Sequence, residues 1–152
     1  MSELFNADSL QSLQRDIGVW LAGLAVTNPA IVAVDRDDRD EPRWYVRLRG
    51  EEKEFITVWI TLGQRTLRYE AYVMPAPEEN AVVLYENLLR RNERLVGVHF
   101  AIGIEDAVFL RGAIANVLIS EDELDHIIGS LFAAIEQCYQ SLLRIGFASR
   151  FG

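Results

Sequence analysis

The sequence predicts an α+β fold in which helices pack on an antiparallel sheet, in the order helix, three strands, helix, two strands, helix (α-βββ-α-ββ-α). Residues 44–49, 55–62 and 67–73 alternate between apolar and polar side chains, which is typical of strands with one buried face. The connections between these segments are too short for crossovers, so neighbouring strands must run antiparallel. Helical spacing of apolar residues occurs before, between and after the strands, in separate blocks. That arrangement argues against a parallel, doubly wound sheet.

Composition indicates one domain spanning residues 1–152. Half of the 152 residues are hydrophobic, which is enough to fill a core. A net charge of −8 repels phosphate backbones, so we expect no nucleic-acid partner. Cys138 is the single cysteine, which excludes an internal disulfide and favours a reducing compartment. The chain shows no leader pattern and no apolar run of about 18 residues, so we expect a cytoplasmic protein without membrane contact.

The first predicted helix has Asp8 as its N-cap and carries an apolar stripe that ends near Ala25. Asn28-Pro29 stops it, because proline disfavours helix in the residue before it. The apolar run at residues 31–34 is consistent with an extra short strand. The acidic segment DRDDRDE at residues 35–41 is predicted to be a solvated loop.

The three central strands have a predictable register. A two-residue turn at Gly63-Gln64 would pair Leu62 with Arg65. The same register would place the following pairs opposite each other: Ile60 and Leu67, Val58 and Tyr69, Ile56 and Ala71, Trp59 and Arg68, Thr57 and Glu70, Phe55 and Tyr72. A three-residue loop at 51–53 would set Arg47 beside Thr57.

The second helix is predicted to begin at Pro77, with Glu78 and Glu79 near its positive end and Asn92 at its last turn. Two apolar strands, at residues 96–102 and 107–114, follow through a loop at 103–106. Ser120 and Glu123 form a capping box that opens the last helix. Gly146 is predicted to end this helix. Its apolar stripe consists of seven residues: Leu124, Ile127, Ile128, Leu131, Ile135, Cys138 and Leu142.

No residue set points to catalysis, a metal or a cofactor. The acidic cluster at 35–41 fails the ligand spacing of a calcium loop, and neither His99 nor His126 has partners at zinc-binding spacing. Cys138 lies on the apolar stripe of the last helix, where it acts as a small hydrophobe. We therefore expect a protein that is not an enzyme and holds no cofactor.

One face of the predicted sheet mixes aromatic side chains with arginine, which is typical of protein-binding surfaces. Its candidate binding residues are Tyr45, Arg47, Phe55, Trp59, Arg68 and Tyr72, with Arg49 beside them. Two other interpretations stay open: a helix of the same chain covers this face, or Arg68 simply stacks on Trp59.

The chain resembles the YbjN family, described as sensory-transduction regulators, and more distantly the class I type III secretion chaperones. The motifs that carry the resemblance are WYVRLRG, WITLGQRTLRYEAYVMP, YENLLRRN, HFAIGIEDAVFL, LDHIIGSLFAAIEQC and RIGF, within about residues 43–147. The resemblance implies a chaperone-like α+β fold, usually dimeric, that binds extended protein segments. It implies no catalytic residues.

We therefore expect a non-enzymatic protein-binding or regulatory domain, a homodimer that contacts an unidentified protein partner. The alternative is a small-molecule sensor with a pocket between the sheet and the last helix. A third option is dimerisation alone, with no further ligand.

Overall fold

The computed structural model describes residues 6–38 and 40–151. Its main elements in chain order are α1 (Ala7–Thr27), β1 (Ile31–Asp38), β2 (Pro42–Arg49), β3 (Phe55–Leu62), β4 (Thr66–Met74), α2 (Ala81–Asn92), β5 (His99–Ile102), β6 (Val108–Ala115) and α3 (Glu121–Gly146). The α+β prediction is confirmed, with one strand more in the first run. None of the helices in these residues is long and apolar enough to span a bilayer.

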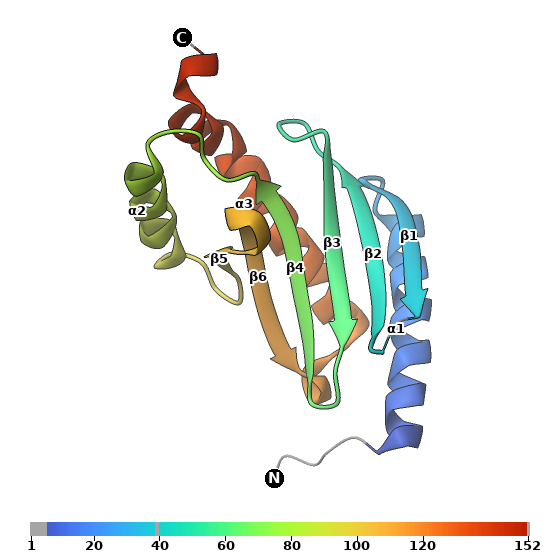
Figure 1. Cartoon of the computed structure of the whole chain (residues 1–152). Helices are drawn as coiled ribbons and strands as arrows, with labels where there is room; N and C mark the ends of the chain where they lie inside the picture. Colours follow the sequence, from blue (N-terminus) through green and yellow to red (C-terminus); the bar gives the residue numbers. More distant parts are fainter. Residues whose placement is uncertain (1–5, 39, 152) are drawn as a thin grey trace.

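The strands form one antiparallel sheet in the order β1-β2-β3-β4-β6-β5 (Figure 1). The first four strands are a meander, because each is joined to the next by a short turn. Helix α2 then carries the chain past the position of β6 to the far edge, and β6 returns to pair with β4. Hence β1 and β5 are the two edge strands.

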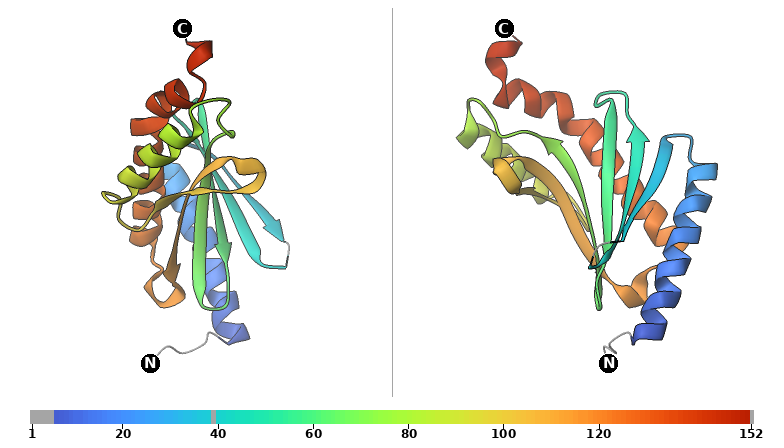
Figure 2. Two further views of the ribbon diagram at one scale, coloured as in Figure 1. Left: turned by 60° about the vertical axis from the view of Figure 1, so that its left-hand side comes forward. Right: turned by 45° about the vertical axis from the view of Figure 1, so that its right-hand side comes forward.

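All three helices lie on the same side of the sheet (Figure 2). Helix α3 crosses the middle strands, α1 lies beside β1, and α2 lies near β5. The core forms between them: Ile17 and Leu21 of α1 and Leu131 of α3 are fully buried, as are Val46 and Ile60 of the sheet. The opposite side of the sheet has no helix over it.

The N-cap of α3 is the predicted residue, whereas the N-cap of α1 lies two residues before the predicted one. The Ser120 hydroxyl accepts a hydrogen bond from the Glu123 N–H, as the capping box predicts. In α1 the N-cap is Asn6, whose side chain accepts from the Ser9 N–H at 2.8 Å. Asp8 lies inside the first turn, where its negative charge interacts favourably with the positive end of the helix dipole.

The predicted start of α2 at Pro77 is wrong, because the helix begins at Ala81. The N–H groups of Glu78 and Glu79 donate to the carbonyl of Gly146, at 2.9 and 3.1 Å, and so are held at the end of α3. Asn80 then adopts a left-handed conformation, with φ of 57°, that turns the chain into the helix. A tertiary contact overrides the local helix signal at Pro77.

The first strand is longer than its apolar run. It extends from Ile31 to Asp38, so the prediction of a solvated loop from Asp35 is wrong for residues 35–38. Pairing with β2 supports these charged residues: Arg36 stacks 5.4 Å from the Trp44 ring, and Asp37 accepts a hydrogen bond from the Tyr45 hydroxyl. Arg39, within the same segment, lies outside the described residues.

The β3–β4 register differs from the prediction by two residues. Leu62 pairs with Leu67 and Trp59 with Glu70, because the turn tip is Gln64-Arg65. Asn116 stabilises that turn by two hydrogen bonds. Its backbone N–H donates to the Arg65 carbonyl, and its side-chain amide donates to the Gly63 carbonyl. A shift of two residues preserves which side chains share a face.

The β2–β3 connection matches the prediction. The Gly50 N–H donates to the Glu54 carbonyl, which closes the three-residue loop, and Arg47 pairs with Thr57. Strands β5 and β6 also form, starting three residues and one residue later than predicted.

Candidate functional site

The side of the sheet that faces away from the helices, called the open face below, is the candidate site. Strand alternation and pairing place on it Tyr45, Arg47, Phe55, Trp59, Arg68, Tyr72, Arg43, Glu70, Phe109, Arg111 and His99. Trp59 is 37% exposed and Tyr72 is 40% exposed. In the described chain no helix covers them, so the interpretation that a helix shields this face is wrong.

Aromatic rings and guanidinium groups order one another at the β2–β3 end of the open face. Tyr45 meets Trp59 edge to face, with ring centroids 5.7 Å apart. Arg43 lies 5.4 Å from the Trp59 ring, and Arg47 lies 3.9 Å from the ring of Phe55. These side chains are therefore held in place before any partner arrives.

A second aromatic group lies on β4 and β6. Tyr72 packs edge to face against Phe109, at 5.7 Å, and the Lys53 ammonium lies 5.2 Å from the Tyr72 ring. Burial lowers the pKa of Lys53. Burial also raises the pKa of Tyr72, and the nearby Tyr139 and Glu105 raise the pKa of Tyr72 further by smaller amounts. Phe109 is buried because the β5–β6 turn at Gly103 passes over its ring.

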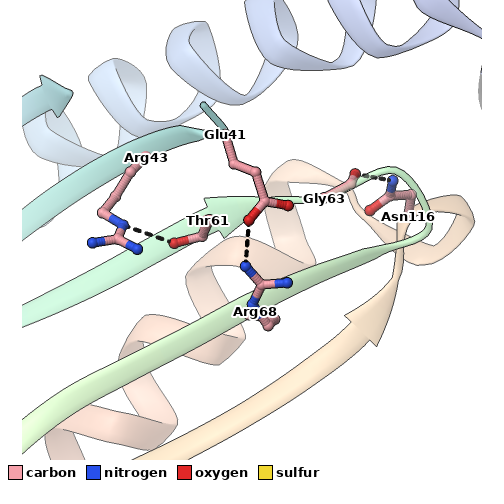
Figure 3. Close-up of polar contacts among 6 residues, drawn as sticks. All are labelled: Glu41, Arg43, Thr61, Gly63, Arg68 and Asn116. Carbon is pink, nitrogen blue, oxygen red and sulfur yellow. Dashed lines mark hydrogen bonds and ion pairs between the residues drawn. The ribbon is translucent and has the colours of Figure 1, made fainter. Parts of the chain in front are cut away.

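Ionic contacts cross the middle of the open face. Glu41 reaches from the β1–β2 connection to Arg68, at 2.6 Å, and Glu70 accepts from Arg111 at 2.6 Å. Arg43 donates through Nε to the Thr61 hydroxyl at 3.0 Å (Figure 3). Thr61 is only 6% exposed, so two arginines flank a buried hydroxyl.

The open face holds a shallow depression of about 420 Å³ at these ionic contacts. Its walls include Arg43, Trp59, Arg68, Arg111 and His99. It therefore brings three guanidinium groups and an indole together in a chain whose net charge is −8.

The structure brings all six predicted binding residues onto one face. The alternative in which Arg68 stacks on Trp59 is wrong, because the register places Arg68 beside Thr61 and Glu70 beside Trp59. Arg43 takes that place on the indole. The sequence interpretation missed both Arg43 and Arg111. Strand parity could have identified Arg43, because it lies two residues before Tyr45 on the same strand. Arg111 could be placed on this face only from the β4–β6 pairing.

Among the other sequence candidates, His99 lines the depression, and the described residues show no grouping of metal ligands. No group of three or more His, Cys, Asp or Glu side chains within residues 6–38 and 40–151 lies close enough to hold a metal ion. Cys138 is 2% exposed, and burial raises the pKa of its thiol to about 11. Such a thiol is a weak nucleophile at neutral pH.

The sequence matches the YbjN family, described as "Putative bacterial sensory transduction regulator", over residues 17–144. It is 34% identical over 108 residues to the Uncharacterized protein Rv0487 of Mycobacterium tuberculosis, covering 71% of this chain and 59% of that protein. It is 31% identical over 107 residues to the Uncharacterized protein ML2442 of Mycobacterium leprae, covering 70% and 58%. The matched region thus spans less than two thirds of these relatives.

The fold is shared with solved structures, among them the following two. The ExsC-ExsE complex contains a chain with a TM-score of 0.62 and 18% identity, covering 86% of this chain and 96% of that one. The Yersinia pestis type III secretion chaperone SycH, solved with a stable fragment of YscM2, gives a TM-score of 0.50 at 14% identity, covering 77% and 94%. At these identities the likeness shows a type III secretion chaperone-like fold.

Proposed function

The chain belongs to the YbjN family, and on this basis we propose that it is a non-enzymatic, protein-binding regulatory domain. The open face is the proposed contact surface for an extended protein segment. The observation that carries the proposal is the placement of all three helices on one side of the sheet, which leaves ordered aromatic and arginine side chains on the other.

The side-chain chemistry supports this function. Trp, Tyr and Arg are enriched among the residues that contribute most to binding at protein interfaces. Trp and Tyr bury a large area at low entropic cost, and Arg adds several hydrogen-bond donors. Here Tyr45, Trp59 and Arg43 already hold one another in place, so binding would order few side chains. The complexes of ExsC-ExsE and of SycH with YscM2 lend support by analogy of fold.

The free sheet edges are less suited to binding by strand addition. On β5, the Asn92 side chain accepts from the Phe100 N–H at 2.6 Å and donates to the Phe100 carbonyl at 3.2 Å. Those two backbone groups are therefore occupied. The other edge strand, β1, carries Asp35, Arg36 and Asp37, and charged residues discourage edge pairing.

Replacing Trp59 with Ala tests the proposal. We expect Trp59→Ala to reduce the amount of protein cross-linked to the purified domain in native lysate, while circular dichroism and thermal melting still show a folded protein. The matched control is Phe151→Ala, which removes an aromatic that is 52% exposed beyond α3. Equal capture by Trp59→Ala and wild type would contradict a contact role for the open face.

We also propose that the protein is a cytoplasmic homodimer. Val82 and Leu89 of α2 and Ile102 of β5 are 81%, 69% and 50% exposed, and apolar exposure of this extent favours self-association. Light scattering on the purified chain measures the mass. A monomer across the micromolar range would contradict the dimer and leave the open-face proposal untouched.

A small-molecule sensor is the second candidate function. A depression of about 260 Å³ lies between β5 and α3, lined by Phe100, Ala134 and Cys138 together with Arg91 and Arg94 of the α2 end. A metabolite panel in a thermal-shift assay tests it. A flat panel counts against this second candidate.

A further inference from the structure

The terminal nitrogens of the Arg43 guanidinium are positioned for an oxyanion. Its Nε donates to the buried Thr61 hydroxyl, and its plane lies near the Trp59 ring. Within the described residues, no carboxylate pairs with it, whereas Arg68 and Arg111 pair with Glu41 and Glu70. A guanidinium fixed at Nε presents two parallel N–H donors, which is the geometry that a carboxylate accepts.

We infer that Arg43 and Arg68, on either side of Thr61, form a carboxylate-binding subsite for acidic side chains of the partner segment. The inference rests on the proposed function and names the chemistry of its partner: an extended segment rich in Asp or Glu with neighbouring apolar residues. Trp59 forms the adjacent apolar wall of the same depression.

Charge distribution selects this occupant. The chain as a whole has a net charge of −8 and would attract basic segments and repel acidic ones. At the depression Glu41 pairs with Arg68 and Glu70 with Arg111, which leaves Arg43 as the guanidinium without an ion-pair partner among the described residues. Asp37 lies opposite Arg43 on β1 and accepts a hydrogen bond from the Tyr45 hydroxyl. An acidic segment would therefore bind against the overall charge of the chain, through the guanidinium donors of this site.

Glu41 is the internal competitor for the subsite. Its carboxylate passes over Gly63 to contact Arg68, as Figure 3 shows. Both side chains of this pair are about half exposed, at 54% for Arg68 and 44% for Glu41, so water weakens the contact. A partner carboxylate can replace it at little cost.

The test uses three blocked ten-residue peptides labelled with fluorescein, in which Glu, Gln or Lys alternates with Val and Tyr. We expect the Glu peptide to bind in fluorescence anisotropy with a dissociation constant below about 1 mM, at least tenfold tighter than the Gln and Lys peptides. Binding should weaken when salt is raised. No Glu-peptide binding, or equal affinity for the Gln peptide, overturns the inference.

Variants locate the binding. Arg43→Gln and Arg68→Gln should each weaken the Glu peptide about tenfold, and Glu41→Gln should strengthen it about two- to fivefold. Arg43→Lys keeps the charge but loses the paired donors, so it should also bind several-fold more weakly. The control is Arg90→Gln on α2, which changes the net charge equally at a remote exposed site. Equal loss in Arg90→Gln, or full affinity in Arg43→Lys, contradicts the subsite.

The failures of the two proposals are distinguishable. If Trp59→Ala lowers partner capture but Glu and Gln peptides bind alike, the protein-binding function stands and the carboxylate subsite is wrong. If the Glu peptide binds through Arg43 but Trp59→Ala captures as much partner as wild type, the open-face function is wrong, and the assignment of the carboxylate site to a partner segment is wrong with it.

Discussion

Glu136 of α3 stabilises the β2–β3 turn by accepting three backbone hydrogen bonds. Its carboxylate receives the N–H groups of Glu51, Glu52 and Lys53, the last two at 3.0 Å each. Successive N–H groups that converge in this way form a concave anion site. The contact joins residues about 85 positions apart and attaches the turn to the last helix. Glu136→Ala removes all three acceptor contacts.

The size of the effect follows from the solvent exposure of the turn. Hydrogen bonds to a charged group contribute about 1.5–3 kcal/mol when shielded from water. Glu136 is half-buried and the Glu51 and Glu52 amides are exposed, so each bond is worth less here. We expect Glu136→Ala to lower the free energy of unfolding by about 2 kcal/mol, which lowers Tm by roughly 4–8 °C in a chain of this size.

Urea unfolding followed by circular dichroism measures this loss, with Gln137→Ala as the matched control on the same helix. A second variant tests the mechanism: a Cβ at Gly50 would overlap the Lys53 carbonyl oxygen and the Glu136 carboxylate, so Gly50→Ala should disturb the same turn. In the double variant the two losses should be less than additive. A Glu136→Ala loss within about 0.5 kcal/mol of the control would refute the reasoning.

Two further predictions concern β5 and α3. Asn92→Ala leaves the Phe100 N–H and carbonyl without their side-chain partner, so it should cost about 2 kcal/mol of unfolding free energy and speed hydrogen exchange at Phe100. Asn87→Ala loses one part-buried hydrogen bond from Arg91 and leaves the Phe100 backbone contacts in place, so it should not change exchange at Phe100; equal exchange in both variants would count against the edge-capping role. Burial raises the pKa of Cys138 to about 11 in the folded protein, whereas the thiol pKa in the unfolded chain is about 8.5. As pH rises, the unfolded state therefore loses this proton first. The free energy of unfolding should fall as pH rises above about 8.5. Urea unfolding at pH 8 and pH 10 should show the advantage of wild type over Cys138→Ala shrinking by about 2 kcal/mol, and a constant difference would contradict this.

Local patterns carried most of the predicted fold. The apolar stripe of α3 is buried at all seven predicted positions from Leu124 to Leu142, because a 3.6-residue period alone sets which side meets a sheet. Strand parity likewise assigned the faces of β2, β3 and β4 correctly, since alternation does not depend on register.

The errors occurred where distant residues meet. Asn116 bonds to Gly63 and Arg65 and moves the β3–β4 turn by one residue, which shifts the pairing by two. Gly146 holds the residues before α2 and delays that helix by four residues. The charged half of β1 is a strand because β2 offers pairing partners, although its own composition disfavours one.

By itself, the sequence determined the type of the main elements other than the charged half of β1, and the set of six residues that share the aromatic and arginine face, because both depend on periodicity along a short segment. Tertiary structure alone decided that all helices lie on the other side of the sheet and that Arg43, not Arg68, stacks on Trp59. These features depend on which side of the sheet each connection crosses and on one turn held by Asn116. No local pattern encodes either, because both are set by contacts between segments far apart in the chain.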